Sequence, residues 1–407
     1  MKTIWIINQY ASTPETGMGG RSYYLAQELA KQGFRVYLVA STANHLLREK
    51  PAVVGSFTLK IQKKITFVWV KMPEYENSHS KQRVFNWFLF AWRIKTLRKI
   101  ISHKPDVILC SSPSPVAFLG AQYLAKKCKA KLVFEVRDIW PLTLTEIGNF
   151  SKKHPFILLL QWIEDRAYRY SDRVVSNLKN SVEHMIARGM ETEKFAWIPN
   201  GFSRDEFSSV KPLDADVLRE LPRNKFIVGY TGTFGLANDL YTLLDAASQL
   251  RQYQEINFVL VGGGKEKLEL VDYSNKLGLA SVFFIDAIGK KQIPTMLAHF
   301  DVLAVGAKKE PMYRFGVSPN KLFEYLIASK PIIYYIDSGN YHPIEDAQCG
   351  LEVEPGNSAL LADAILKLYR LSDDDRAVMG SNGHRLALQE YDYAELAKKL
   401  SHILFSN

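Results

Sequence analysis

Each half of this chain begins with the same local pattern, in which a buried strand runs into glycines and then into a helix. Residues 3–10 read TIWIINQY and lead to the loop ETGMGGR, while residues 225–232 read KFIVGYTG and lead to a helical pattern from about residue 238. Short apolar runs then alternate with amphipathic stretches, which is typical of a parallel sheet with helices on both faces. The pattern predicts an α/β chain of two Rossmann-like domains facing each other across a cleft, with ligands at the carboxyl ends of the strands.

A polar stretch at about 203–224 separates the two halves, and a length of 407 residues fits two or three domains. We expect an N-terminal domain over residues 1–205 and a C-terminal domain over 206–385. The last segment, 386–407, is predicted as a helix that packs back on the first domain. The stretch FTLKIQKKITFVWVK (57–71) departs from the alternation and is predicted as a hairpin or an excursion at the sheet edge.

The charge is distributed unevenly along the chain. The net charge is +10, but residues 1–206 hold 31 Lys and Arg against 17 Asp and Glu, a net of +14, and the remainder has a net of −4. Such asymmetry indicates an anionic partner for the first half, which is a nucleic acid, an anionic membrane or a phosphorylated substrate.

Several classes of protein are excluded by what the chain lacks. No apolar run approaches the roughly 18 residues of a membrane span, and the N-terminus reads as a strand and not as a secretory signal. The cysteines are three in number and widely spaced, at positions 110, 128 and 349, which excludes a disulfide framework and predicts a cytoplasmic protein. Neither G-x-S-x-G nor a P-loop motif is present.

The glycine loops are the first candidate binding elements. Gly19 and Gly20 precede the first helix, where backbone amides and the helix N-terminus favour an anion. The loops YTGTFG (230–235) and VGGGKEK (261–267) have the same form. Each loop taken alone is equally consistent with an ordinary tight turn between a strand and a helix.

The segment PMYRFGVSPNKLFEYLIASKP (311–331) predicts a helix with Ser318 as its N-cap and a proline at the first helical position. Asn320 and Lys321 would then stand at the positive end of the helix, which suits a diphosphate. Glu324, one turn later, can accept hydrogen bonds from ribose hydroxyls. The alternative is a well-capped helix on which Lys321 and Glu324 form a surface pair.

Charged residues also follow a buried strand of the first half, in FEVRDIWP (134–141). Arg137 and Asp138 lie just past this strand, and SSPSP (111–115) ends a neighbouring one. At a cleft edge, either charged group can contact a reacting sugar or a developing phosphate charge. The alternative is a structural salt bridge.

Residues 77–105 contain seven Lys and Arg and no acidic residue, with aromatic residues interleaved. A helix here carries an aromatic face beside a basic one, which suits an acceptor or membrane-interface segment that includes Arg83, Trp87, Trp92 and Arg93. The alternatives are a core helix with a solvated basic back, or a nucleic-acid site without a recognised motif.

Metal binding is not predicted. The D-x-D sequence at 214–216 lies in the polar stretch between the domains and not at the carboxyl end of a strand, and the nine histidines are scattered. The three aspartates at 373–375 begin a helix and complement its dipole.

The chain resembles a family 4 glycosyltransferase of the GT-B fold, in the subgroup similar to the O-antigen and capsule enzymes that transfer N-acetyl-fucosamine. The matching stretches run in the expected order through nearly the whole chain: NQYASTPETGMGGR, SSPSP, VFEVRDIWP, IPNGF, GYTGTFGLANDL, VGGGKEKLEL and RFGVSPNKLFEYLIASKPII. The strings SPNKLFEY and RDIWP are specific to the family, whereas the glycine loops are not.

The resemblance implies a UDP-sugar donor held mainly by the second domain and an acceptor on the first. Lys321 would meet the diphosphate, Glu324 the ribose and Gly232 the phosphates, while Asp138 lies next to the place where relatives keep a histidine facing the sugar. The family retains anomeric configuration and needs no metal or other cofactor. The residues implied in catalysis are Arg137, Asp138 and Lys321, and those implied in donor binding are Gly19, Gly20, Gly232, Thr233, Gly263, Ser318, Asn320, Lys321 and Glu324.

Two departures from the family pattern affect the donor site. The family carries a glutamate eight positions before the one matching Glu324, and here that position is Gly316. The basic residue that follows the glycine loop in relatives is also missing, because Thr233 follows Gly232. We expect backbone amides around residues 316–318 to replace the missing carboxylate.

Together these features predict a transferase that moves an N-acetylated or amino-deoxy hexose from a UDP-sugar to a lipid-linked precursor of a bacterial surface polysaccharide. The basic first half predicts peripheral attachment to the inner face of the cytoplasmic membrane, and no nucleic-acid partner is expected. Two alternatives are a non-catalytic scaffold that binds a nucleotide sugar, which Gly316 favours, and a dinucleotide-dependent epimerase or oxidoreductase. The absence of G-x-G-x-x-G in the first loop argues against the latter.

Overall fold

The computed structural model describes residues 1–407 except 18, 76–79, 209 and 407. The chain forms two compact units, of which the first comprises Met1–Pro199 with the residues from Tyr393 onward and the second comprises Asn200–Asp392. The division therefore falls six residues earlier than the predicted boundary at 205/206, and the chain leaves the second unit after residue 392 and not after 385.

Hydrogen bonds within the second unit explain where the chain enters and leaves it. The backbone N–H of Asn200 donates to the Ser318 hydroxyl over 2.9 Å. The N–H of Phe202 donates to the carbonyl of Tyr391 over 2.9 Å, and Phe202 pairs with Asp392 in an isolated bridge. The entering and leaving segments are thus paired with each other inside this unit.

The first unit is built on an eight-stranded sheet in the order β3-β4-β2-β1-β5-β6-β7-β8. Neighbouring strands are parallel except β3 and β4, which form an antiparallel hairpin at one edge, so the hairpin expected over 57–71 is confirmed. The strands are β1 (Thr3–Ile7), β2 (Arg35–Ser41), β3 (Phe57–Gln62), β4 (Ile65–Val70), β5 (Val107–Ser111), β6 (Lys131–Val136), β7 (Arg173–Ser176) and β8 (Phe195–Trp197).

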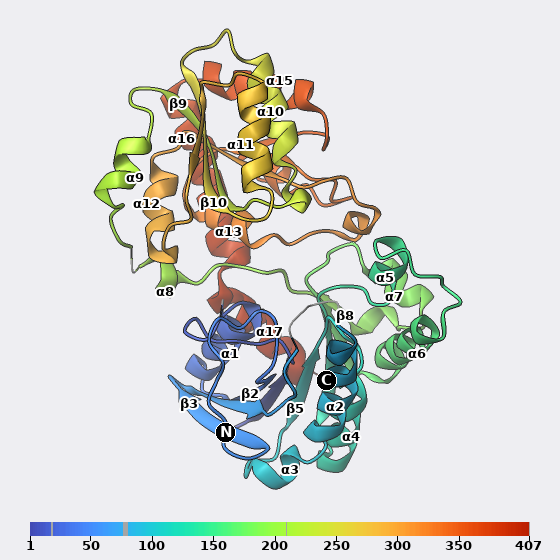
Figure 1. The fold of residues 1–407 in the computed structure, drawn as a ribbon. Helices are drawn as coiled ribbons and strands as arrows, with labels where there is room; N and C mark the ends of the chain where they lie inside the picture. Colours follow the sequence, from blue (N-terminus) through green and yellow to red (C-terminus); the bar gives the residue numbers. More distant parts are fainter. Residues whose placement is uncertain (18, 76–79, 209, 407) are drawn as a thin grey trace. The chain divides into compact units, whose positions relative to one another are not determined.

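Helices cover both faces of this sheet (Figure 1). All five residues of β1 are buried, as expected for a strand between two helical layers. The helices are α1 (Arg21–Lys31), α2 (Lys81–Ile94), α3 (Leu97–Ile100), α4 (Ala117–Cys128), α5 (Leu142–Glu146), α6 (Pro155–Tyr170), α7 (Val182–Ala187) and α17 (Tyr393–Phe405), with a 3₁₀ turn at Thr192–Lys194.

The last helix of the chain, α17, belongs to the core of the first unit. Leu396, Leu400 and Leu404 are fully buried in the same apolar cluster as Leu29 of α1. At the start of the helix, the ring of Tyr393 stacks on that of Tyr24 with 5.2 Å between centroids. Figure 1 shows α1 and α17 side by side.

The second unit repeats the plan with six parallel strands in the order β11-β10-β9-β12-β13-β14. The strands are β9 (Phe226–Thr233), β10 (Ile256–Gly263), β11 (Val282–Ile285), β12 (Val302–Gly306), β13 (Ile332–Tyr335) and β14 (Gly350–Glu352). The α-helices are α8 (Arg204–Phe207), α9 (Ala215–Glu220), α10 (Leu240–Gln249), α11 (Lys267–Lys276), α12 (Ile293–Ala298), α13 (Asn320–Ile327), α14 (Pro343–Asp346), α15 (Ser358–Arg370) and α16 (Asp373–Leu386). Shorter turns are the 3₁₀ segments Leu236–Asn238, Lys290–Gln292 and Pro311–Phe315 and the π-helical segment Ala387–Tyr391.

In both sheets the first strand is the point at which the strand order reverses. In the first unit β1 lies between β2 and β5, and in the second β9 lies between β10 and β12, so the chain builds each sheet outward in opposite directions from there. Ligands of open parallel sheets bind at this switch point, beyond the carboxyl ends of the strands. The predicted two-domain α/β fold is confirmed, and it places the loops after β1, β5, β9 and β12 at the two expected sites. Across the described residues, each helix is too short or too polar to cross a bilayer.

We expect Leu400→Ala to destabilise the first unit by about 2–5 kcal/mol, because the buried side chain leaves a cavity between α17 and the sheet. Hydrogen exchange should accelerate in α17 and α1 and stay unchanged in α10 of the second unit. Leu360→Ala, at an exposed position on α15, is the control. Equal protection in both variants would contradict the assignment of α17 to the first core.

Candidate functional site

Helix α13 presents the most distinctive polar group of the second unit. It begins at Asn320 after Pro319, whose extended backbone supplies the N-cap geometry. The prediction of Ser318 as the N-cap is wrong, because its hydroxyl and its carbonyl are both taken by Asn200, at 2.9 and 2.8 Å. Ser318 therefore anchors the segment that enters this unit, while Asn320 and Lys321 occupy the first turn as expected.

The Lys321 ammonium group lies in a largely desolvated position beside the carboxyl end of β9. Its Nζ donates to the Tyr230 hydroxyl at 2.8 Å and to Asn238 Oδ1 at 2.5 Å, and it sits 4.4 Å from the centre of the Tyr230 ring. Burial lowers the pKa of Lys321 to about 7. An anion bound here would restore the charged form of this lysine.

Glycine backbone borders one side of this lysine. Gly232 has φ 150°, and a Cβ at this position would lie 3.3 Å from Lys321 Nζ and 3.0 Å from the Tyr230 hydroxyl. Its carbonyl oxygen would be 1.9 Å from a Cβ on Gly262 of the paired strand, whereas Gly263 has open space beside it. The structure thus brings Gly232 and Lys321 together, with Thr233 exposed and paired with Gly263 at the strand ends.

Glu324 has a different partner from the one that the helix pattern suggests. Its carboxylate is bound by the ammonium group of Lys290, which follows β11, and not by Lys321. The Glu324 side chain is 17% exposed and that of Lys290 is 54% exposed. The alternative in which Lys321 and Glu324 form a surface pair is therefore not supported. Sequence reasoning missed Lys290, whose only signal is a basic pair soon after a strand.

The glycine that departs from the family pattern lies in a backbone conformation that favours glycine. Gly316 ends the 3₁₀ turn Pro311–Phe315 with φ 93°, which a glutamate rarely adopts. Its N–H already donates to the Tyr313 carbonyl at 2.8 Å. The amide of Gly316 is therefore used inside the turn and is not available to replace a carboxylate contact.

In the first unit, two glycines with positive φ lie in the loop between β1 and α1. Gly19 and Gly20 have φ of 67° and 86°, and Gly20 directly precedes α1. A Cβ on Gly20 would meet nothing within 4 Å, whereas one on Gly19 would be 3.2 Å from the Tyr24 hydroxyl. The structure does not describe Met18 of the same loop.

A buried ion pair supports this loop. Arg21 Nε donates to Glu135 Oε1 at 2.8 Å, the Ser111 hydroxyl donates to Oε2 at 2.6 Å, and both charged side chains are 1% exposed. Burial alone would raise the pKa of Glu135, but Arg21 and Arg137 hold it below its usual range. Arg21 also binds the carbonyl of Pro199. Sequence reasoning missed this pair, although both residues lie within the two motifs it singled out.

Arg137 and Asp138 follow β6 as predicted. Their backbone N–H groups both approach the Ser112 hydroxyl, at 2.8 and 3.4 Å. In the described part of the chain no ion pair joins the two side chains, so the salt-bridge alternative does not apply. Asp138 is exposed, whereas Arg137 Nε is buried and has no hydrogen-bond partner among the described residues.

The basic aromatic segment 77–105 divides into inner and outer residues, and its positions 77–79 lie outside the described residues. Trp87 is 3% exposed, and its Nε1 donates to the Tyr10 hydroxyl at 2.6 Å. Arg83 lies over the rings of both residues, and Arg93 binds the carbonyl of Lys71. Trp92, by contrast, is 65% exposed. Trp87 thus fits the core-helix alternative, and Trp92 does not.

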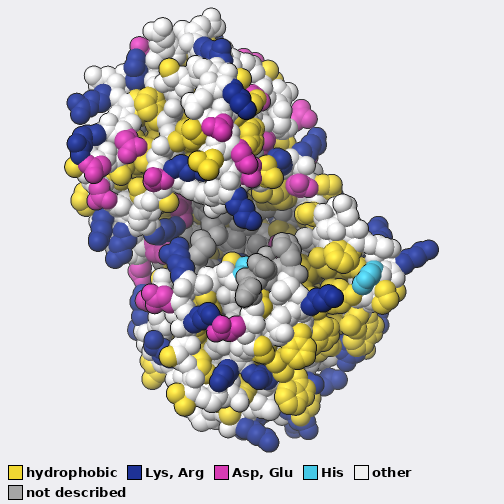
Figure 2. Space-filling view, in the orientation of Figure 1, with side chains coloured by type: hydrophobic (Ala, Val, Ile, Leu, Met, Phe, Trp, Pro, Cys, Tyr) yellow, Lys and Arg dark blue, Asp and Glu magenta, His cyan; other side chains and the backbone are white. Residues whose placement is uncertain are grey.

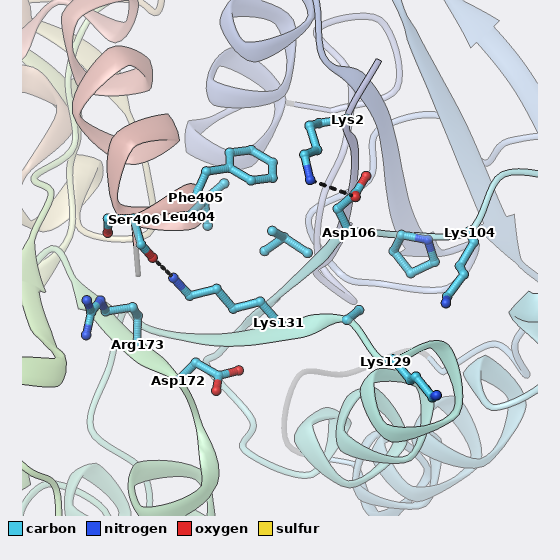
Figure 3. Close-up of a pocket in the computed structure, with 13 residues that line it drawn as sticks. Lys2, Lys104, Asp106, Lys129, Lys131, Asp172, Arg173, Leu404, Phe405 and Ser406 are labelled. Carbon is cyan, nitrogen blue, oxygen red and sulfur yellow. Dashed lines mark hydrogen bonds and ion pairs between the residues drawn. The ribbon is translucent and has the colours of Figure 1, made fainter.

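A hollow at the opposite, amino end of the first sheet has a structural explanation. Figure 3 shows that Lys131 extends toward the end of α17. Its ammonium group binds the carbonyls of Ser406 and Ile403, and the Lys2–Asp106 pair at 3.2 Å lies at the same hollow. A cation at the C-terminus of a helix complements its dipole. Lys131 therefore holds the end of the last helix in place.

Metal-ligand side chains gather at one place in the described part of the chain. His342, Glu345 and Glu352 bring one ligand atom each within 4.8 Å of one another. Glu352 is already satisfied, however, because His342 Nδ1 lies 2.8 Å from one carboxylate oxygen and the N–H of Ile344 lies 3.0 Å from the other. The cluster reads as a cap on α14.

Comparison with known protein families matches both units. Residues 16–206 match the family described as Glycosyltransferase Family 4, and residues 218–386 match Glycosyl transferases group 1. A curated relative is the Escherichia coli (strain K12) protein WcaI, whose name assigns it to colanic acid biosynthesis as a glycosyl transferase. It is 25% identical over 325 residues, which is 77% of this chain and 78% of the relative.

Solved structures share the fold over the whole chain. Sucrose-phosphate synthase from Thermosynechococcus elongatus superposes with a TM-score of 0.74 at 16% identity, covering 99% of this chain and 98% of that one. HepE from Anabaena, solved in complex with UDP-glucose, superposes with a TM-score of 0.64 at 18% identity and covers 100% of both chains. At these identities the likeness shows the two-domain fold.

Replacing Arg21 by methionine should cost the first unit about 3–5 kcal/mol, because the Glu135 carboxylate would stay buried without its partner. The double variant Arg21→Met/Glu135→Gln should recover a large part of this loss. Urea unfolding, with hydrogen exchange to separate the two units, measures both. If the double variant were as unstable as the single one, the ion pair would not be the source of the effect.

Proposed function

This chain belongs to the family 4 glycosyltransferases of the GT-B type, and we propose that it transfers a sugar from a UDP-sugar to a lipid-linked precursor of a bacterial surface polysaccharide. The observation that carries the proposal is the desolvated Lys321 beside Gly232 at the switch point of the second sheet. The name of WcaI, which refers to colanic acid biosynthesis, and the UDP-glucose complex of HepE support it.

Lys321 and the start of α13 are proposed to hold the diphosphate of the donor. The lysine ammonium and the free N–H groups of the first helical turn both favour negative charge, and the charge on UDP grows as the sugar leaves. Phosphate oxygens are proposed to approach the strand ends at Gly232, Thr233 and Gly263, where Thr233 is exposed and Gly263 has open space beside it. Glu324 is proposed to accept the ribose hydroxyls.

Lys290 is part of this proposal because it already holds Glu324. The ion pair fixes the direction of the carboxylate before a donor arrives, and a second carboxylate oxygen stays available for a hydroxyl. Of the backbone amides expected to compensate for the missing glutamate, that of Gly316 is used inside its own turn, and Lys290 offers a second way to complete the site. The donor site is then completed by a lysine in place of a second acid.

The acceptor is proposed to bind on the first unit, where Gly20 lies in the loop after β1, and where the N–H groups of Arg137 and Asp138, after β6, approach Ser112, after β5. The Nε of Arg137, which is buried and has no hydrogen-bond partner among the described residues, suits a diphosphate or a sugar hydroxyl of a lipid-linked precursor. Asp138, exposed beside it, is proposed to face the reacting sugar. We further propose that transfer retains anomeric configuration, uses no metal, and acts on an N-acetylated or amino-deoxy hexose in O-antigen or capsule synthesis. Its proposed location is the inner face of the cytoplasmic membrane.

Lys321→Ala should reduce sugar transfer at least tenfold, which corresponds to about 1.4 kcal/mol of barrier. It should also weaken the binding of UDP, measured by calorimetric titration, with GDP and NAD titrated in parallel for comparison. Lys276→Ala, at an exposed position in the last turn of α11, is the matched control and should behave as the wild type. Unchanged transfer in Lys321→Ala would remove this lysine from the mechanism, and tight NAD binding would favour the dinucleotide alternative.

The affinity for UDP should fall as the pH rises above about 7. In the free protein burial lowers the pKa of Lys321 to about 7, so above this pH the lysine is neutral, and binding a diphosphate requires it to take up a proton. The affinity then decreases by up to tenfold per pH unit until the pKa of the bound form is reached. The number of protons taken up on UDP binding is measured by calorimetry at pH 8 in two buffers that differ in ionisation enthalpy.

The control for this pH dependence is Lys321→Met, which should bind UDP weakly and without proton uptake. The phosphate groups are already ionised at pH 8, because their second pKa is about 6. A wild-type protein that takes up no proton would show that Lys321 stays charged in the free protein.

A further inference from the structure

We propose that the outward faces of α2, α4 and α6, with the loop 147–154 that precedes α6, form one docking surface for an anionic lipid bilayer. This inference deepens the proposed function, since it rests on an acceptor that is anchored in a membrane. We call this surface the α2–α4–α6 face, and define it by Phe85, Trp92, Tyr123, Phe150, Leu158 and Trp162.

Large apolar side chains are exposed on all these elements. Phe85 and Trp92 lie seven residues apart on α2 and are 56% and 65% exposed. On α6, Leu158 and Trp162 lie four residues apart and are 56% and 53% exposed. Both spacings place each pair on one side of its helix. Exposed apolar groups of this size, when they are contiguous, mark interaction sites on soluble proteins.

Buried contacts hold the three helices together behind this face. Trp87 of α2 and Leu160 of α6 share one apolar cluster, against which Leu119 of α4 packs. Between α4 and α6, Arg166 Nε donates to Gln122 Oε1 at 2.7 Å. Figure 2 shows the hydrophobic side chains gathered over this side of the first unit, with Lys and Arg around them. The exposed residues are therefore mounted on a common, packed base.

The charge around the face is positive. Residues 81–100 contain six Lys and Arg and no acid, α4 ends with Lys126 and Lys127, and the loop 147–154 contributes Lys152 and Lys153. A basic residue near an anionic membrane contributes about 1 kcal/mol of attraction. These elements supply both the apolar and the electrostatic contributions to membrane binding.

The two acidic residues of α6 are neutralised or hidden. Glu164 is 2% exposed and accepts a hydrogen bond from the Tyr168 hydroxyl at 2.8 Å. Asp165 accepts two hydrogen bonds from the Arg188 guanidinium, at 2.7 and 2.6 Å. Neither helix acid therefore offsets the positive potential of the face.

Several Lys and Arg side chains of this face lie beside aromatic rings, an arrangement that is common at membrane interfaces. The Arg166 guanidinium lies 5.6 Å from the Trp162 ring centre and 4.8 Å from that of Tyr170. Lys95 and Lys127 both lie within 6 Å of the Tyr123 ring centre. Aromatic rings with cations beside them suit the headgroup layer, where the apolar body is buried and the charge stays in water.

The same observations argue against a second copy of this chain as the occupant. A twofold interface places each surface patch against itself, so the basic residues of one copy would face those of the other. Like charges across an interface cost several kcal/mol. An anionic bilayer is complementary to both the exposed apolar groups and the positive charge of the face.

Vesicle sedimentation with the full chain tests the proposal. We expect binding to vesicles of phosphatidylcholine with 30% phosphatidylglycerol, weakening as salt rises, and at least tenfold weaker partition with phosphatidylcholine alone. Trp92→Ser/Trp162→Ser and Lys152→Glu/Lys153→Glu should each reduce partition at least tenfold. Ile61→Ser, which changes an exposed apolar residue on β3 of the same unit (79% exposed), is the control and should bind as the wild type.

Calorimetric titration with UDP separates this proposal from the proposed function. The face variants should bind UDP as the wild type does, because the donor site lies in the other unit. Wild-type partition in both face variants, or binding that ignores the anionic lipid, would overturn the docking surface while leaving the transferase proposal intact. A dimer in solution that Trp92→Ser/Trp162→Ser abolishes, without vesicle binding, would also overturn it in favour of self-association.

Discussion

The order of the parallel strands determines where chemistry can occur in this protein. In each sheet the first strand has a later strand hydrogen-bonded on either side, β2 and β5 beside β1 and β10 and β12 beside β9. The connections leave these neighbours toward opposite faces, so their carboxyl ends are not covered by a crossing loop. Gly20 and Ser112 occupy this position in the first unit, and Gly232 and Lys321 border it in the second.

The second unit keeps a lysine where water is scarce, and this choice works against its stability. Desolvation disfavours the ammonium ion, and its two hydrogen-bond partners, the Tyr230 hydroxyl and the side-chain amide oxygen of Asn238, are neutral. Under the proposed function, a bound diphosphate would stabilise the charged form of Lys321 and offset part of this desolvation cost.

The fold follows closely from the sequence, because strand burial and helix periodicity are local properties of a parallel sheet. The placing of Gly232 near Lys321 follows from the resemblance of their motifs to those of relatives. Pairings across long separations were not predictable in this way: Lys290 and Glu324 are 34 residues apart, and Arg21 and Glu135 are 114 apart. Ser318 was assigned wrongly because a helix-capping pattern does not reveal that Asn200 competes for its hydroxyl.

The sequence alone does not show which aromatic residues of α2 are buried and which are exposed. Trp87 and Trp92 lie in the same basic stretch, and only the packing of α4 and α6 against the helix decides that one is buried and the other exposed. Periodicity defines the faces of a helix but not which neighbour covers each face.

The return of α17 to the first unit has a consequence for biosynthesis. While a ribosome adds residues 200–392, the first unit lacks its last helix, and the α1 side of its core exposes the surface that Leu396, Leu400 and Leu404 later cover. At usual rates of translation this interval lasts about 10 to 40 s. The second unit has a contiguous sequence and can finish folding first. During synthesis it is therefore the first unit whose exposed apolar core surface is open to aggregation.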